Sequence, residues 1–424
     1  MKKLVSLLLA LALCLSLASF ASAEGEWEYK EATISMMVGN DQVMTGIDAV
    51  LALAKEKLGI TVEIENRVDE SVLKTRLAAG EATDIVSYNC GALLVAQNPA
   101  AYFLSLNDHP EITDRLDDGF EQSVTVNGVT YGVPIDCSNA GCILYWKPLY
   151  EELGLEIPKT WDEFLANCEV IKNAGYNAIL SADAKTSSTQ LIFLGDFYNV
   201  MAEDPTFVTE FEAGRAKYAT NPAAFKSWQK YETVLPYLQD GHEACGLEDG
   251  LELFASGSSA HWIYFSSILG NLYDLYGSEV TDHVGIFAIP GDDPENTGIT
   301  VWQPEAFYIN KNSEKIDDCL RFLEFYISDE ALDAYTEAVV PHGAMLVKGY
   351  TIKNTYPAVA NDLQAYFDAG RTCSAQEFIS AVKGANCRSF TGGILSGLYS
   401  AAEAAALYDE DCKLQAVQLG LDWE

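Results

Sequence analysis

Strands and helices alternate strictly in the first part of this chain, and this alternation limits the folds open to it. Alternating apolar residues indicate strands, and apolar residues at helical spacing before Gly59 and Gly80 indicate helices. The order predicts right-handed crossovers and a largely parallel sheet. The five expected elements are Thr33–Val38, Ile47–Leu58, Thr61–Glu65, Ser71–Ala79 and Asp84–Tyr88.

The carboxyl ends of these strands form the first candidate binding region. Ligands of open parallel sheets bind beyond the carboxyl ends of the strands. This rule points to Asn40 and Asp41 after the first strand and to Asn89 after the third. We therefore expect these three side chains to lie at the ligand site.

A second informative stretch runs from Asn127 to Leu165. Asn127-Gly128 between valine-rich segments predicts a hairpin turn. Thr160 with Glu163 three residues later predicts a capping box, at the start of a helix that Gly175 can end. Hairpin, strand, loop and capped helix follow one another here in an unusual order.

Three segments of this stretch carry a resemblance to a known family: Tyr131–Pro134, Leu144–Lys147 and Pro158–Phe164. They resemble, in the same order, the hinge-crossing region of the extracellular solute-binding proteins of ABC importers, in the sugar-binding family related to maltose-binding protein. The resemblance continues along most of the chain. Its further segments are Gly80–Val86, Phe254–Ala260, Gly285–Pro290, Tyr308–Ser313 and Pro341–Ala344.

The resemblance implies an α/β, two-lobe periplasmic-binding-protein fold of the larger type, with a cleft between lobes and several interlobe crossings. Strands are expected at Val284–Ile289 and Val301–Ile309. The crossings are expected near residues 135–141, 283–289 and 340–346. The N-terminal lobe would then comprise residues 24–136 and 287–342, and the C-terminal lobe residues 137–286 and 343–424.

The resemblance also implies a set of ligand-binding side chains. Aromatic rings that stack on sugar faces and short polar groups that donate and accept hydrogen bonds are what a sugar site needs. Trp161 matches a prominent family residue, but its place at a helix start predicts packing. Besides Asn40, Asp41 and Asn89, the implied ligand-binding residues are Tyr88, Asp136, Tyr145, Tyr264, Phe265, Trp302 and Arg388.

Signatures of catalysis and of cofactor binding are missing from the sequence. There is no Walker A loop, GxGxxG, GxSxG or HExxH motif. The five histidines show no metal-like pairing, and His242 with Cys245 supplies two ligands, too few for a zinc site. We therefore expect no catalytic residue, metal or cofactor. A pair of glycoside-cleaving carboxylates is not excluded, but none stands out.

The first 23 residues have the pattern of a secretion signal. Lys2 and Lys3 precede an apolar core over Leu4–Leu17, and Ala21–Ala23 provides a cleavage site after Ala23. Cys14 is a poor lipobox cysteine because a leucine precedes it. Cleavage would leave 424 − 23 = 401 residues and move the net charge from −36 to −38. This acidity argues against binding to nucleic acid or to anionic membranes.

Nine cysteines remain after such cleavage, an odd and scattered set in a chain long enough to build a large core. Cys168 and Cys319 lie in helical patterns and are expected to be buried as small apolar residues. Cys137 with Cys142, and Cys373 with Cys387, remain open as local disulfides.

The resemblance implies the extracytoplasmic substrate-binding component of an ABC importer. Such a protein captures a small molecule, here a carbohydrate, by hinge closure and delivers it to the membrane permease. We expect a secreted monomer. The alternatives are a secreted sensor that presents its ligand to a receptor, a binder of a cationic solute, for which Asp41 and Asp136 are suited, and a carbohydrate-active enzyme.

Overall fold

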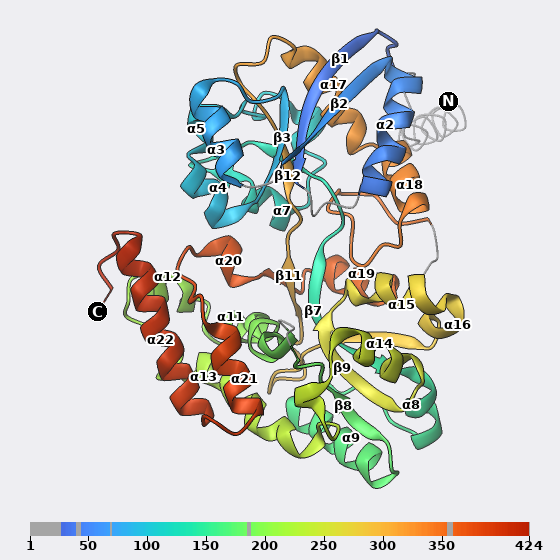
Figure 1. Ribbon diagram of the computed structural model, residues 1–424, viewed down its shortest axis with the longest axis vertical. Helices are drawn as coiled ribbons and strands as arrows, with labels where there is room; N and C mark the ends of the chain where they lie inside the picture. The colour runs from blue at the N-terminus through green and yellow to red at the C-terminus, as the bar shows by residue number, and fades with distance from the viewer. Residues whose placement is uncertain (1–26, 40–43, 68–69, 185–187, 354–358, 424) are drawn as a thin grey trace, which may run out of the picture.

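The computed structural model describes residues 27–39, 44–67, 70–184, 188–353 and 359–423. Two lobes lie one above the other in Figure 1, each an α/β unit with its own sheet. The secretion signal and the two residues Asn40 and Asp41 lie outside the described residues. Within the described part of the chain, no helix combines the length and the apolar character needed to cross a bilayer.

The first lobe is built on a five-stranded sheet of order β2-β1-β3-β12-β6. Strand β1 pairs in parallel with β2 and β3, as the alternation of strands and helices predicts. Strand β12 runs antiparallel to both β3 and β6. The strands are β1 (Ala32–Gly39), β2 (Ile60–Arg67), β3 (Ile85–Tyr88), β6 (Gly132–Pro134) and β12 (Ala306–Ile309).

Helices cover this first sheet. The predicted helices are present as α2 and α3, and Gly59 ends α2 with a φ of 75°, a conformation that favours glycine. The hairpin turn is confirmed, since Asn127 and Gly128 both have positive φ between β4 and β5. The remaining elements are α2 (Met44–Leu58), α3 (Glu70–Ala79), α4 (Gly91–Gln97), α5 (Pro99–Tyr102), α6 (Pro110–Thr113), α7 (Asp118–Ser123), β4 (Thr125–Val126), β5 (Val129–Thr130), α17 (Ile316–Tyr326) and α18 (Asp329–Ala338).

The second lobe is built around β7, which pairs with three antiparallel strands, β9, β10 and β11. Strands β8 and β13 extend this six-stranded sheet in parallel with β9 and β11. Burial along β7 does not alternate: six of its eight residues are buried, which indicates a strand covered on both faces. The strands are β7 (Asn139–Trp146), β8 (Asn177–Leu180), β9 (Ser259–Phe265), β10 (Val284–Ala288), β11 (Ile299–Trp302) and β13 (Thr372–Ser374).

The helices of the second lobe include the predicted capped helix, α9. Thr160 Oγ1 accepts from the Glu163 amide at 3.2 Å, whereas the Glu163 carboxylate reaches back to the Lys159 amide at 2.7 Å. The helices are α8 (Lys147–Leu153), α9 (Trp161–Asn173), α10 (Leu191–Leu194), α11 (Phe197–Glu203), α12 (Phe207–Glu212), α13 (Pro222–Val234), α14 (Leu247–Ala255), α15 (Ile268–Tyr276), α16 (Ser278–Thr281), α19 (Ala360–Asp368), α20 (Gln376–Ile379), α21 (Cys387–Leu395) and α22 (Ala401–Gln418), with the 3-10 turns Ser188–Gln190, Leu235–Tyr237 and His242–Ala244.

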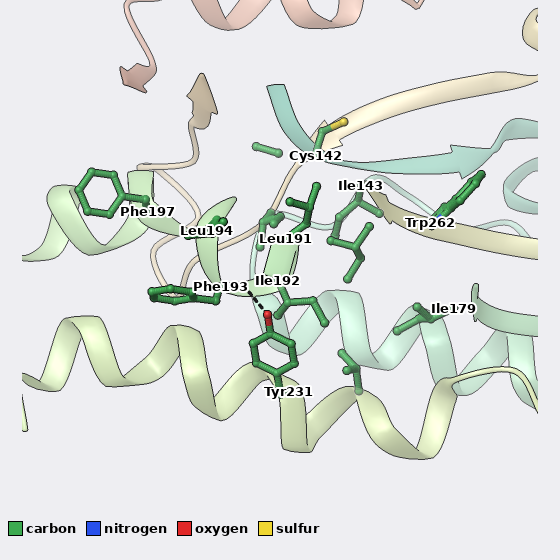
Figure 2. Close-up of a cluster of buried hydrophobic side chains, with 14 of the residues drawn as sticks. Cys142, Ile143, Ile179, Leu191, Ile192, Phe193, Leu194, Phe197, Tyr231 and Trp262 are labelled. Carbon is green, nitrogen blue, oxygen red and sulfur yellow. Dashed lines mark hydrogen bonds between the residues drawn. The ribbon is translucent and has the colours of Figure 1, made fainter. Parts of the chain in front are cut away.

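Each lobe has its own hydrophobic core. Figure 2 shows part of the second core, in which Tyr231 points toward α10 and its hydroxyl accepts from the Phe193 amide at 3.1 Å. Trp161 is buried, and its Nε1 donates to Thr233 Oγ1 at 3.0 Å, which agrees with a packing role. Cys168 and Cys319 are fully buried as expected. All nine cysteines of the described chain are free, so neither open disulfide pair is formed.

Three segments connect the lobes. The first lies between β6 and β7, at residues 135–138. The second is residues 303–305, between β11 in the second sheet and β12 in the first. The third follows α18 and reaches the second core at Val359. These three segments are called the crossing segments below.

The second crossing differs from its predicted position. Residues 283–289 contain β10, which pairs with β7 along its whole length and therefore lies inside the second lobe. The predicted single strand Val301–Ile309 is two strands, because Pro304 has no amide to donate to a ladder and the chain changes sheets there. The strand pairing favours assigning residues 287–302 to the second lobe, and core packing favours assigning residues 343–350 to the first. We propose these lobe boundaries in place of those expected from the sequence.

Candidate functional site

The second sheet presents three strand ends to the region where the chain crosses between lobes. Strand β7 begins at Asn139, directly after the first crossing segment. Because β9 and β11 run antiparallel to β7, they end where β7 begins: Trp302 lies opposite Asn139, and Phe265 lies opposite Gly141. These strand ends therefore come together beside the crossing segments, and Figure 1 shows β7 and β11 running toward the first lobe.

Phe265 and Trp302 form an aromatic pair at this end of the sheet. Their ring centroids lie 4.8 Å apart with an interplanar angle of 85°, an edge-to-face arrangement. Both side chains are half-buried. The Trp302 ring lies over Gly141, where an added Cβ would come within 2.9 Å of the indole. Glycine at position 141 thus leaves room for the Trp302 ring and for the backbone of Gly195.

A polar network borders the aromatic pair. Asn139 Oδ1 accepts from Ser266 Oγ at 3.0 Å and from the Ser267 amide at 3.1 Å. Asn139 Nδ2 donates to Ser267 Oγ at 3.3 Å. Amide and hydroxyl groups both donate and accept, which suits them to recognise the hydroxyls of a polar ligand.

Carboxylate and amide groups lie on the other side of Trp302. Trp302 Nε1 donates to Glu377 Oε1 at 2.9 Å, and Lys383 Nζ donates to the same oxygen at 2.8 Å. Gln303 Nε2 donates to Ser374 Oγ at 3.1 Å. Glu377 Oε2 and Gln303 Oε1 are buried and accept no hydrogen bond from the described residues. Buried acceptors normally have partners, so leaving these two atoms without one costs free energy in the structure as it stands.

The first lobe places a buried ion pair beside the second crossing segment. Arg67, at the end of β2, donates to the Ser87 carbonyl at 2.6 Å and to Glu305 Oε1 at 2.8 Å. The exposed fractions of the two ionic side chains are 6% and 10%. The Glu305 carbonyl accepts from the Ile135 amide at 3.1 Å, which joins the first and second crossing segments. The Arg67–Glu305 ion pair thus anchors the end of β2 to the second crossing segment, which is itself hydrogen-bonded to the first.

The first and third crossing segments meet at Asp136, Cys137 and His342. One side-chain ligand atom from each lies within 4.8 Å of the others. Asp136 and His342 are half-buried, whereas Cys137 is 3% exposed, and burial raises the pKa of its thiol well above the ordinary value. The sequence predicts Asp136 as a ligand contact but gives no sign that His342, some 200 positions further along the chain, lies beside it and Cys137.

The predicted site residues divide into two groups. The structure brings Asp136, Phe265 and Trp302 to the crossing segments. Asn89 lies at the end of β3, half-buried, where its carbonyl accepts from the Tyr308 hydroxyl at 3.1 Å. Of the group predicted from the carboxyl ends of the strands, Asn89 alone falls within the described residues.

Four other predicted residues lie elsewhere. Tyr88 is 1% exposed in the first core. Tyr145 is six residues along β7 from Asn139, about 20 Å at the usual rise per residue, and it packs on Tyr150 at 4.7 Å. Tyr264 packs on Trp262 at 4.9 Å and contacts the edge of Phe265 at 6.3 Å, behind the aromatic pair, and Arg388 is exposed on α21, which packs against α22. We therefore leave Tyr88, Tyr145, Tyr264 and Arg388 out of the site considered below.

Several residues of this region were not predicted from the sequence. Gln303 and Glu305 flank Pro304 directly after Trp302, so the strand break was a usable signal for them. Arg67 and Glu377 carry no comparable signal, because each reaches the site through the pairing of segments far apart in the chain.

Comparison with known proteins supports a family assignment. Residues 48–341 match the profile of the family described as bacterial extracellular solute-binding protein, which is a substrate-binding and not an enzyme family. The chain is 33% identical over 103 residues to the "Multiple sugar-binding protein" of Streptococcus mutans serotype c. That match covers 24% of each chain, so the chain spans about a quarter of the length of this curated relative.

Solved structures share the fold over almost the whole chain. Apo RafE from Streptococcus pneumoniae matches with a TM-score of 0.76 and 19% identity, over 90% of this chain and 98% of that chain. A family 1 extracellular solute-binding protein from Bifidobacterium longum subsp. infantis matches with a TM-score of 0.73 and 21% identity, over 91% and 99%. The two-lobe α/β fold expected from the sequence is thus confirmed. The chain belongs to the family of bacterial extracellular solute-binding proteins.

Proposed function

We propose that this chain is the extracytoplasmic substrate-binding component of an ABC importer and that it captures a carbohydrate between its lobes. The observation that carries the proposal is the half-buried Phe265–Trp302 pair beside the half-buried amide and hydroxyl groups of Asn139 and Ser267. Apolar ring faces stack on the C–H faces of a sugar, and carboxylate and amide oxygens accept from its hydroxyls.

Similar proteins support the same ligand class. A multiple sugar-binding protein is among the curated relatives, and the structural neighbours include "SBP RafE in complex with raffinose" and "Chitin oligosaccharide binding protein". We propose that a signal peptide cleaved after Ala23 directs the chain out of the cytoplasm. A monomer with closed lobes would then dock on the membrane permease, which would take up the sugar.

Hinge closure follows from the arrangement of the crossing segments. The aromatic pair belongs to the second lobe, whereas Asn89 and Arg67 belong to the first. A ligand that contacts both sides favours the closed form by its additional contacts there. Capture therefore requires no covalent chemistry on this chain.

The test is a thermal-shift screen of the mature protein against mono- and oligosaccharides, with amino acids and polyamines as controls. A ligand that binds only the native state adds about 2.7 kcal/mol of stability at a hundred times its dissociation constant, which shifts the melting temperature. We expect a shift with one saccharide class and no product after long incubation. A shift with polyamines alone would replace the carbohydrate by a cationic solute. Conversion of a sugar would indicate an enzyme.

Two aromatic variants locate the binding site once a sugar is found. Trp302→Ala should weaken binding by more than tenfold, which corresponds to about 1.4 kcal/mol, because stacking and water exclusion are lost. Tyr145→Ala is the matched control, since Tyr145 lies at the far end of the same sheet, and calorimetry should find its affinity within twofold of wild type. The opposite ranking of the two variants would contradict the proposed site and return Tyr145 to it.

A further inference from the structure

Asp136, Cys137 and His342 combine three different metal-ligating groups at one point of the hinge. Their carboxylate, thiol and imidazole ligand atoms all lie within 4.8 Å of one another. They come from two segments that are more than 200 residues apart in sequence but pair side by side where the chain leaves the first lobe.

Backbone contacts hold these two segments in register. Cys137 forms an antiparallel bridge with Met345, and the Ser138 amide donates to the Ala344 carbonyl at 2.9 Å. A Cβ at Gly343 would lie 1.8 Å from the Ser138 carbonyl oxygen, so only glycine permits this approach. The cluster is therefore positioned by main-chain contacts that do not depend on a ligand.

The surroundings of the three groups orient them further. The Cys137 amide donates to Asp136 Oδ1 at 2.6 Å. A donor to a carboxylate is an outer contact of the kind that commonly orients metal ligands. Because Asp136 and His342 are half-buried, the cluster remains open to solvent on one side.

We propose that Asp136, Cys137 and His342 bind one zinc-like divalent cation, with water in the fourth position. Sulfur, nitrogen and carboxylate oxygen together suit Zn²⁺, whereas Ca²⁺ and Mg²⁺ select oxygen alone. Tetrahedral Zn²⁺ sets its sulfur and nitrogen ligands about 3.6 Å apart, so the cluster needs only a small contraction. On binding, the Cys137 S–H bond breaks, a sulfur–metal bond forms and the proton passes to solvent.

Such a cation would tie the first crossing segment to the third. It would stabilise the hinge without contacting the Phe265–Trp302 pair, so the proposal is independent of carbohydrate binding. The site is accordingly tested in the absence of sugar.

The experiment is a titration of the mature, reduced protein with Co²⁺, followed by displacement with Zn²⁺. Wild type should bind one Co²⁺ with a thiolate-to-cobalt charge-transfer band, and Zn²⁺ should remove that band and raise the melting temperature. Cys137→Ser should abolish the band, and His342→Gln should weaken Co²⁺ binding by more than tenfold. Matched controls are Cys373→Ser and His109→Gln, which lie outside the cluster and should behave as wild type.

His342→Gln leaves the buried thiol in place, so it carries the test if Cys137→Ser fails to fold. No charge-transfer band in wild type, or an unchanged Co²⁺ affinity in His342→Gln, would overturn the proposal. A carbohydrate that still binds in either case would leave the proposed function intact.

Discussion

Gly343→Ala tests how closely the crossing segments approach each other. Besides lying 1.8 Å from the Ser138 carbonyl oxygen, the added methyl group would lie 2.7 Å from the carbonyl carbon. Ser138 is fully buried, so its backbone cannot move aside into solvent. The first and third crossing segments must separate instead, and the hydrogen bond from Ser138 to Ala344 is strained or lost.

The expected loss of stability is the sum of the cost of the steric overlap and the cost of the weakened hydrogen bond. Overpacking of a tight contact costs about 1–3 kcal/mol, and a lost backbone hydrogen bond costs about 1 kcal/mol. We therefore expect the free energy of unfolding of Gly343→Ala to fall by about 2–4 kcal/mol. The reduced stability should appear as a lower urea midpoint in both tryptophan fluorescence and far-ultraviolet circular dichroism.

Gly270→Ala is the matched control. Gly270 lies in α15 with no atom within 4 Å of an added Cβ, and its φ is not positive. Alanine in such a helical position should stabilise by about 0.4–1 kcal/mol. A Gly343→Ala protein as stable as wild type would show that the two segments do not approach as described, and it would remove the main-chain support for the Asp136–Cys137–His342 cluster.

Two further predictions concern buried charges in the second lobe. Lys230→Met leaves the Asp196 carboxylate buried without its ion-pair partner and should lower the free energy of unfolding in urea by about 3–5 kcal/mol. Lys226 is a more exposed lysine nearby, so Lys226→Met should cost at most about 1 kcal/mol. Equal losses of stability in the two variants would refute the burial argument. Burial lowers the pKa of His261 from 6.5 to about 4, so the unfolded state binds more protons between these values and stability should fall by about 3 kcal/mol as the pH drops from 6.5 to 4. His261→Gln should reduce this slope in acid titrations monitored by urea midpoint, and an unchanged slope would assign it to other groups.

Local patterns predicted the first sheet well, because its information is local. Each strand from β1 to β3 is followed by a helix, and parallel pairing of neighbours is the usual result. The hairpin at Asn127 and Gly128 is likewise set by the conformations open to two adjacent residues.

Long-range pairing was not predictable in the same way. Strand β7 pairs with β10 and β11, which lie about 140 to 160 positions further along the chain, and the apolar pattern of a strand does not identify its partner. The crossing that the resemblance implied at residues 283–289 is instead a strand paired with β7 inside the second lobe. Pro304 was a local sign of the real break, but it is weak unless the strands on either side are known to belong to different sheets.

The position of a residue along its strand explains why Trp302 lies beside the crossing segments whereas Tyr145 does not. Trp302 and Tyr145 both lie on strands of the second sheet, and resemblance alone ranked them together. Strand periodicity fixes the face on which a side chain lies, but its distance from the ligand depends on which end of the strand meets the crossing segments. Trp302 ends β11 at a crossing, whereas Tyr145 lies at the distal end of β7.

The three crossing segments form one hydrogen-bonded strip, and this bears on how binding and hinge motion are related. The Ile135 amide joins the first segment to Glu305 in the second, and the Ser138 amide joins it to Ala344 in the third. A rotation of the lobes about this strip changes distances between lobes more than distances within the strip. The separation of the aromatic pair from Asn89 should therefore change on closure. The Asp136–Cys137–His342 cluster should keep its geometry, so a bound cation would stabilise the hinge in open and closed forms alike and leave sugar affinity nearly unchanged.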